Sequence, residues 1–232
     1  MEICKKNSSL VACFPKAELL KMYETHKKSS ILAKLNEQGK TLGDFNSMTE
    51  ALNWVHRLGQ MSANDRDEHE LIAAVFFVVD FYEGTSEICF KLKNSFNYNK
   101  DKTDSIDTLN KYRDDPPDFI IKQSDGWRDF ELKRYREALD TDTIFDFIIK
   151  KVGHYGNLGD MNLLLILQAN GSNELKIDFR DLHERLTKEK YAFRGEILLS
   201  FNNNSAEMVI CQVFPNFAKS IKTFILPSLK RI

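Results

Sequence analysis

Two carboxylates and one amine are brought together by a short predicted hairpin in the middle of the chain. Asp118 begins an apolar segment, the tight turn Ser124-Asp125-Gly126 follows, and residues 127–135 read as the returning strand. Side chains alternate along a strand, so Glu131 and Lys133 face the same way. The neighbouring strand begins with Asp118. We therefore expect all three side chains on one face of a sheet.

This set of groups suits phosphodiester hydrolysis. The carboxylates of Asp118 and Glu131 are the oxygen ligands that Mg²⁺ or Mn²⁺ prefers. Such an ion polarises a phosphoryl oxygen and lowers the pKa of a bound water. Lys133 would orient that water and stabilise developing negative charge. The backbone carbonyl of Leu132 is a candidate further ligand. A surface hairpin with ordinary ion pairs is the alternative interpretation.

Pro117-Asp118, twelve residues, and then Glu131-Leu132-Lys133 resembles the PD-(D/E)XK motif of the restriction-endonuclease-like nuclease superfamily. The resemblance implies that Asp118 and Glu131 bind metal and that Lys133 is catalytic. It extends to the order of elements, because an upstream helix precedes the hairpin, and a helix and a buried strand follow it. The similarity covers roughly residues 64–170.

Members of the superfamily often carry another acidic ligand on the helix before the motif. Glu70 is the candidate, because Glu70-Leu-Ile-Ala-Ala resembles the acidic residue followed by small apolar residues seen there. Glu68, Asp80 and Glu83 compete with it. An acidic side chain in a first helical turn also compensates the helix dipole without any ligand.

Basic residues after the motif are candidates for binding nucleic-acid phosphates. Arg134 and Arg136 continue the motif strand, and Lys150 and Lys151 lie near the end of the next predicted helix. Lysines at a helix end also complement the dipole without a ligand. Trp127 could stack on a base, although an aromatic residue at a strand edge more often packs on the protein itself.

The first part of the chain, residues 1–62, reads as a helical N-terminal segment. Pro15 could open a helix, Ser30 could cap another, and Ser47-Met-Thr-Glu50 has the spacing of a capping box. Residues 63–232 would then form the nuclease-like domain. The N-terminal helices are candidates for a homodimer contact or for docking to a partner protein.

The remaining elements predict an α/β fold with a mixed central β-sheet flanked by helices, the restriction-endonuclease-like arrangement. Asn64 could cap a helix that runs to about Tyr82, and its apolar body indicates packing on more than one side. Residues 86–93 could be a strand or a helical continuation. Further elements follow in the order helix 141–153, buried strand 163–167, helix 179–189, and strands 195–201 and 208–214.

Composition is that of a globular protein, with 42% apolar residues and a formal charge of −1. This charge gives no global signal for nucleic acid, but an enzyme needs only a basic rim around its site. The cysteines are far apart, which argues against a disulfide framework or a zinc site and favours reduced thiols. We expect a cytoplasmic protein without a membrane segment, because the apolar run Leu71 to Val79 is too short to span a bilayer.

The sequence thus predicts a Mg²⁺- or Mn²⁺-dependent nuclease, with DNA favoured over RNA. An endonuclease in defence, restriction, repair or mobile-element processing is the leading hypothesis. The alternative is a catalytically weak or inactive nuclease-fold module that binds nucleic acid or a partner protein. Another kind of α/β enzyme lacks support, because no Gly-rich phosphate loop, serine nucleophile elbow or HExxH motif is present.

Overall fold

The structure, a computed structural model, is built on a nine-stranded mixed sheet whose strands lie in sequence order. It describes residues 2–6, 9–46, 51, 54, 74–75, 78–93, 109, 111, 113–114, 116–135, 137–155, 161–167, 176–189, 193–203 and 207–222. The strands are β1 (Glu2–Lys6), β2 (Ser9–Pro15), β3 (Glu87–Lys91), β4 (Phe119–Gln123), β5 (Gly126–Tyr135), β6 (Asn162–Leu167), β7 (Ile197–Asn203), β8 (Glu207–Phe214) and β9 (Ala218–Lys222). The predicted α/β class with a mixed sheet is confirmed.

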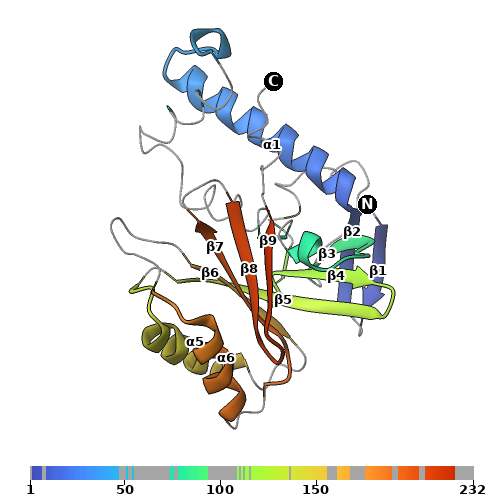
Figure 1. Cartoon of the computed structure of the whole chain (residues 1–232). Helices are drawn as coiled ribbons and strands as arrows, with labels where there is room; N and C mark the ends of the chain where they lie inside the picture. The colour runs from blue at the N-terminus through green and yellow to red at the C-terminus, as the bar shows by residue number, and fades with distance from the viewer. Residues whose placement is uncertain are drawn as a thin grey trace.

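Strand direction follows from the connections. Strands β1 to β5 pair antiparallel, as do β7 to β9, whereas β5–β6 and β6–β7 are parallel. Parallel neighbours need a crossover, and helices supply both: α5 (Thr141–Tyr155) follows β5, and α6 (Phe179–Lys188) follows β6. Figure 1 shows α5 and α6 lying together at one side of the sheet, while α1 (Lys16–Glu37) runs along the other end of the molecule.

One face of the sheet is covered by apolar side chains from the N-terminal half. Ala12, Phe14, Ile88, Phe90, Phe119, Ile121 and Phe130 are buried here with Leu19 of α1 and with the helical residues Ala74, Val75 and Val78. Residues 74–75 and 78–79, which lie on one face of that helix, are buried in this cluster, and packing of the helix on more than one side stays a prediction. Among the described residues, the side chains of β3 to β5 on this face are therefore mainly part of the core.

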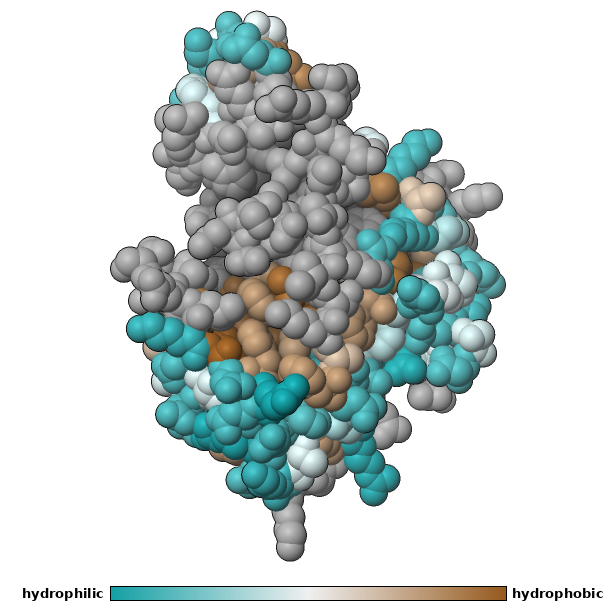
Figure 2. Space-filling view, in the orientation of Figure 1, coloured by the Kyte–Doolittle hydropathy of each residue, from teal (hydrophilic) through white to brown (hydrophobic). Residues whose placement is uncertain are grey.

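The opposite face has two separate apolar clusters. Helices α5 and α6 bury Ile144, Ile148, Leu182 and Leu186 against β6, β7 and β8. A smaller cluster lies over β1 to β4 and consists of Val11, Cys13, Cys89 and Ile120, with Cys4 and Trp127 packed against it. In the view of Figure 2, apolar side chains gather over β7 to β9, and hydrophilic ones cover the region of α5 and α6.

The predicted helical N-terminal segment is wrong at its start. The chain begins with β1 and β2, which join the same sheet as the motif hairpin, and a single helix, α1, follows without a break at Ser30. A short apolar run such as Val11 to Phe14 cannot be assigned to strand or helix by periodicity alone. Its sheet partner β3 lies far along the chain, so local sequence carried no sign of the pairing. The proposed boundary at residues 62–63 lies outside the described residues.

The expectation of four reduced thiols is also wrong. Cys13 and Cys89 form a disulfide across 76 residues of sequence, because β2 and β3 pair in a register that places them directly opposite each other.

Within the part of the chain that the structure describes, no helix is long and apolar enough to cross a membrane.

Candidate active site

The β4–β5 hairpin sets Asp118 and Glu131 face to face. The register pairs Phe119 with Phe130, and the Asp118 N–H donates to the Phe130 carbonyl at 2.9 Å. One step further along this ladder, Asp118 stands opposite Glu131. Residues opposite each other in an antiparallel pair project to the same face. The predicted juxtaposition of the two carboxylates is therefore present, and strand alternation adds Lys133 to it.

Hydrogen bonds hold the Asp118 carboxylate from two sides. Its Oδ2 accepts the Leu132 backbone N–H at 2.7 Å, and its Oδ1 accepts from Arg113 Nη1 at 3.2 Å. The same guanidinium donates to the Asp118 carbonyl at 3.0 Å. With 19% of its side chain exposed, Asp118 is shielded from water but still accessible. Its orientation is thus fixed by protein groups before any ligand binds.

Among the described residues, only one oxygen of the Glu131 carboxylate accepts a hydrogen bond. Its Oε1 accepts from Lys133 Nζ at 2.6 Å, whereas its buried Oε2 has no hydrogen-bond partner among the residues that the structure describes. A carboxylate oxygen left in this state carries the full cost of losing water. Only 9% of the Glu131 side chain is exposed. An unpaired buried oxygen beside a second carboxylate is a donor set that fits a hard divalent cation.

The electrostatic environment of Asp118 also favours a cation at this site. Burial raises the pKa of this carboxyl above its ordinary value, and the neighbouring Glu131 carboxylate raises it further. The Leu132 N–H, Arg113 and Lys133 act in the opposite direction without cancelling the effect. The two carboxylates therefore repel each other in a partly dry site, and a bound cation would relieve that repulsion.

The site lies where the helical cover of its sheet face ends. The parallel register places Glu131 beside Leu163 and Lys133 beside Leu165, and both leucines are buried beneath α5 and α6. On the other side, the face continues through Asp129 and Trp127 toward the cysteine cluster over β1 to β4. Among the described residues, α5 and α6 do not extend over this second side.

The other predicted site residues are placed differently. Leu132 contacts Asp118 through its N–H, and whether its carbonyl serves as a ligand stays a prediction. Arg134 alternates to the sheet face opposite Lys133, so it does not join the three motif side chains. Glu70 and Arg136 lie outside the described residues.

The two lysines of α5 lie on a helix that packs with Ile144, Ile148 and Val152 against the sheet. Lys150 is exposed, and Lys151 Nζ sits 5.2 Å from the ring centre of Phe147 one turn earlier. Both lysines are thus on the same sheet face as the motif residues, at the end of the helix. Phosphate binding by them stays a prediction.

Sequence reasoning missed Arg113. It precedes the Pro116-Pro117 pair in a polar stretch to which no role was assigned, and an isolated bridge between Leu92 and Arg113 holds it beside β3. Only this pairing brings its guanidinium to Asp118. A single arginine among acidic and proline residues gave no local signal for such a contact.

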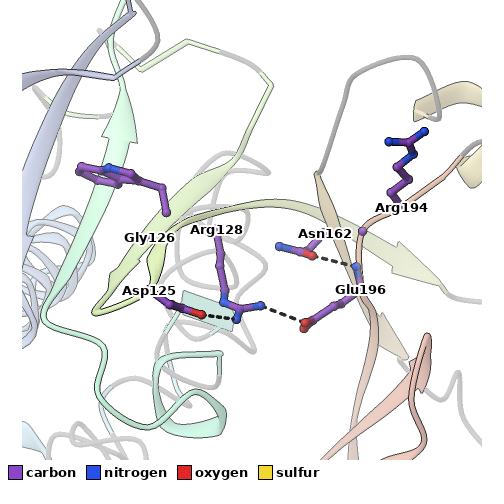
Figure 3. Close-up of a pocket in the computed structure, with 8 residues that line it drawn as sticks. Asp125, Gly126, Arg128, Asn162, Arg194 and Glu196 are labelled. Atoms are coloured by element: carbon purple, nitrogen blue, oxygen red, sulfur yellow. Dashed lines mark hydrogen bonds and ion pairs between the residues drawn. The ribbon is translucent and has the colours of Figure 1, made fainter.

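A separate pocket lies at the turn of the hairpin. Figure 3 shows Arg128 between Asp125 and Glu196, with Arg194 pointing away from them. Arg128 Nη2 lies 3.2 Å from Asp125 Oδ2, and its Nη1 lies 2.9 Å from Glu196 Oε1. The Tyr82 hydroxyl also donates to Glu196. The residues that line this pocket are Asp125, Gly126, Trp127, Arg128, Asn162, Arg194, Gly195 and Glu196. Arg128 alternates to the face opposite Glu131, so this pocket is distinct from the candidate active site.

Comparisons with known proteins give little. No family model matches the chain, and no curated protein matches it. Among solved structures, SfsA of Pyrococcus furiosus in complex with Ca²⁺ is similar at 13% sequence identity and a TM-score of 0.25. The match covers 62% of this chain and 62% of that one, which is less than two thirds of the SfsA chain. This likeness is too weak to support an argument about the site.

Proposed function

We propose that this protein is a divalent-metal-dependent nuclease of the PD-(D/E)XK type, with its active site at Asp118, Glu131 and Lys133. One observation carries the proposal: within the described part of the chain, the buried Glu131 Oε2 has no hydrogen-bond partner, and it lies on a hairpin whose register sets Asp118 opposite it. A structural ion pair needs no such orphaned oxygen. A site built to receive a cation does.

Each residue has a separate task in this proposal. Asp118 and Glu131 would hold Mg²⁺ or Mn²⁺, which when bound supplies Lewis acidity and a more acidic water. The Leu132 N–H keeps Asp118 aimed at the site. Lys133, at 2.6 Å from Glu131, would place its ammonium where an attacking water is held and where phosphoryl charge develops.

Trp127 and the two lysines beside it, Lys6 paired with Asp129 and Lys122 paired with Glu87, lie on the same face and support a nucleic-acid substrate. Trp127 lies between two lysines, with Lys6 Nζ 5.8 Å and Lys122 Nζ 5.5 Å from its ring centre. Along β5, the residues that share this face run Trp127, Asp129, Glu131, Lys133. Stacking on a tryptophan and pairing of lysines with phosphates are the usual means of holding a strand. DNA is the substrate to test first, cut as an endonuclease would cut it.

The test is cleavage of supercoiled plasmid, single-stranded DNA and RNA in Mg²⁺, in Mn²⁺ and in EDTA. We expect cleavage that EDTA abolishes and that falls by about 10²-fold or more in Asp118→Asn and in Lys133→Met. Asp142→Asn is the matched control, because that carboxylate is 84% exposed on α5. Cleavage that persists undiminished in both site variants would refute the assignment.

A nuclease-fold module without activity would behave differently in the same assay. It would bind labelled DNA or RNA, weakened by Trp127→Ala, yet leave every substrate intact in either metal. The cleavage and binding measurements together therefore separate the two candidate functions.

A further inference from the structure

Three cysteine sulfurs and a carboxylate gather on the sheet face over β1 to β3. Cys13 and Cys89 are directly opposite in the β2–β3 register, and the Cys4 sulfur lies 4.0 Å from the Cys13 sulfur. A carboxylate oxygen of Glu87 lies within 4.8 Å of both the Cys13 and Cys89 sulfurs. Wide spacing in sequence, which argued against a metal site, concealed a cluster that only strand pairing creates.

Strand alternation explains the grouping. Glu87 and Cys89 are two residues apart on β3 and share a face, and Cys13 joins them from β2. Cys4 comes from the edge strand β1, where it pairs with Val11 and stands diagonal to Cys13. Four donors from three adjacent strands therefore converge at one place.

The surroundings are those of a closed structural site with one accessible side. Cys13 and Cys89 are 1% and 0% exposed, and they pack against the apolar side chains of Val11 and Ile120. Cys4 and Glu87 are only partly buried and form the outer side. Lys122 Nζ donates to Glu87 Oε2 at 2.9 Å, which orients the carboxylate.

We propose that, once the Cys13–Cys89 disulfide is reduced, Cys13, Cys89, Cys4 and Glu87 bind one Zn²⁺. Thiolates select zinc over magnesium, and three sulfurs with one carboxylate oxygen complete a tetrahedral set. The disulfide uses two of the four donors, whereas a zinc ion uses all of them. Lys122 then acts as the outer partner that orients a ligating carboxylate.

The chemistry balances with a dithiol as reductant. The dithiol closes to its own disulfide and supplies two electrons and two protons, so that the sulfur–sulfur bond breaks and Cys13 and Cys89 become thiols. Zinc binding then displaces the thiol protons. Exchange with an oxidised dithiol reverses the step: its disulfide accepts the two electrons, the Cys13–Cys89 bond forms again, and the ion is released. The disulfide crosslinks β2 to β3, and the zinc form would add the edge strand β1 through Cys4.

The ligands of this site are separate from those of the proposed nuclease centre. They lie on β1 to β3, whereas Asp118 and Glu131 lie at the β4–β5 hairpin, and no ligand is shared. Zinc binding can therefore fail while cleavage succeeds, or the reverse.

The experiment compares full-length protein in its oxidised and reduced forms. Protein reduced with a phosphine is desalted without oxygen, titrated with Zn²⁺ against a chromophoric chelator, and titrated separately with Co²⁺. We expect the reduced chain to bind about one Zn²⁺ more than the oxidised chain, which keeps only the carboxylate site proposed at Asp118 and Glu131. Co²⁺ should give intense sulfur-to-metal charge-transfer absorption, which carboxylate ligands cannot produce.

Variants locate the site. Cys13→Ser and Cys89→Ser should abolish tight binding, and Cys4→Ser should remove about one third of the charge-transfer intensity. Lys122→Met should weaken affinity about 10–100-fold. Cys211→Ser on β8 is the thiol control, and Asp118→Asn tests independence from the nuclease site; both should leave the titration unchanged.

Two results would overturn the proposal. One is a reduced wild-type protein that binds no zinc or gives a Co²⁺ spectrum without thiolate bands. The other is binding that survives in Cys13→Ser. Cys13→Ser changes a buried residue and can therefore disturb folding itself. The Glu87→Gln and Cys4→Ser variants change partly exposed ligands, so they test zinc binding a second time, with circular dichroism to verify folding.

Discussion

Replacing Asp118 with asparagine should make the metal-free protein more stable while it removes metal affinity. Asparagine keeps an oxygen to accept the Leu132 N–H, which is the 2.7 Å contact that orients the side chain. It loses the charge that faces Glu131. The Arg113 guanidinium retains its bond to the residue 118 carbonyl. The substitution therefore removes the repulsion between the two carboxylates together with the charge attraction of Arg113 and Lys133 to Asp118.

The magnitude follows from the hairpin register. Residues directly opposite each other in an antiparallel pair have Cβ atoms about 5 Å apart. Two unit charges at that separation repel by about 3 kcal/mol at an effective dielectric constant near 20. Arg113 and Lys133 offset part of this for Asp118, whose side chain is 19% exposed. We expect a net gain of about 1 kcal/mol, which raises the Tm by roughly 2–4 °C for a chain of this size.

The pH dependence has a definite sign. Because burial and Glu131 raise the pKa of Asp118 in the folded state, the folded protein holds a proton that the unfolded chain has released. Stability from this group therefore declines as pH rises from about 3.9, the ordinary aspartate pKa, to the raised folded-state pKa. Asp118→Asn lacks that decline, so its advantage over wild type should be absent at low pH and complete at neutral pH.

Thermal unfolding in EDTA, followed by circular dichroism across this pH range, measures both effects. Asp142→Asn should stay within about 0.5 kcal/mol of wild type at every pH, because that carboxylate is 84% exposed. Added Mg²⁺ should then reverse the order, since wild type gains about 2.7 kcal/mol at 100-fold the Kd and the variant gains nothing. A metal-free Asp118→Asn that melts below wild type at neutral pH would refute the reasoning.

Four further substitutions test packing, helix capping and ion pairing by denaturant unfolding. Gly195→Ala should lower the free energy of unfolding by at least about 1–3 kcal/mol, because the added Cβ would lie 2.0 Å from the Met161 carbonyl oxygen. Gly153→Ala, with open space around it on α5, should instead raise the free energy of unfolding by about 0.5 kcal/mol. Equal effects at the two glycines would contradict this. Asp178→Ala should cost about 1 kcal/mol, because its carboxylate caps the first turn of α6; no change would mean that the cap contributes nothing. Lys133→Met should lower metal-free stability by about 2 kcal/mol, less than for a fully buried pair because 27% of Lys133 is exposed; a stabilising effect would show that Glu131 does not need it.

Local pattern was enough to predict the hairpin and the elements that follow it. Alternation along residues 126–135 and the turn at Gly126 put Glu131 and Lys133 on one face beside Asp118, and the structure places them so. The predicted helix from Thr141 and the buried strand at Leu163–Leu167 match α5 and β6. These features depend on contacts between near neighbours in sequence, where period and turn chemistry carry the information.

Tertiary structure decided what depends on distant pairing. The N-terminal apolar run became a strand because β3 offered it a partner, and the same register joined Cys13 to Cys89 and brought Cys4 and Glu87 to them. Arg113 reached Asp118 only through its bridge to Leu92. The motif residues alone determined which chemical groups meet. How dry the site is, and which carboxylate oxygen is left for a cation, depended on the helices and strands packed around them.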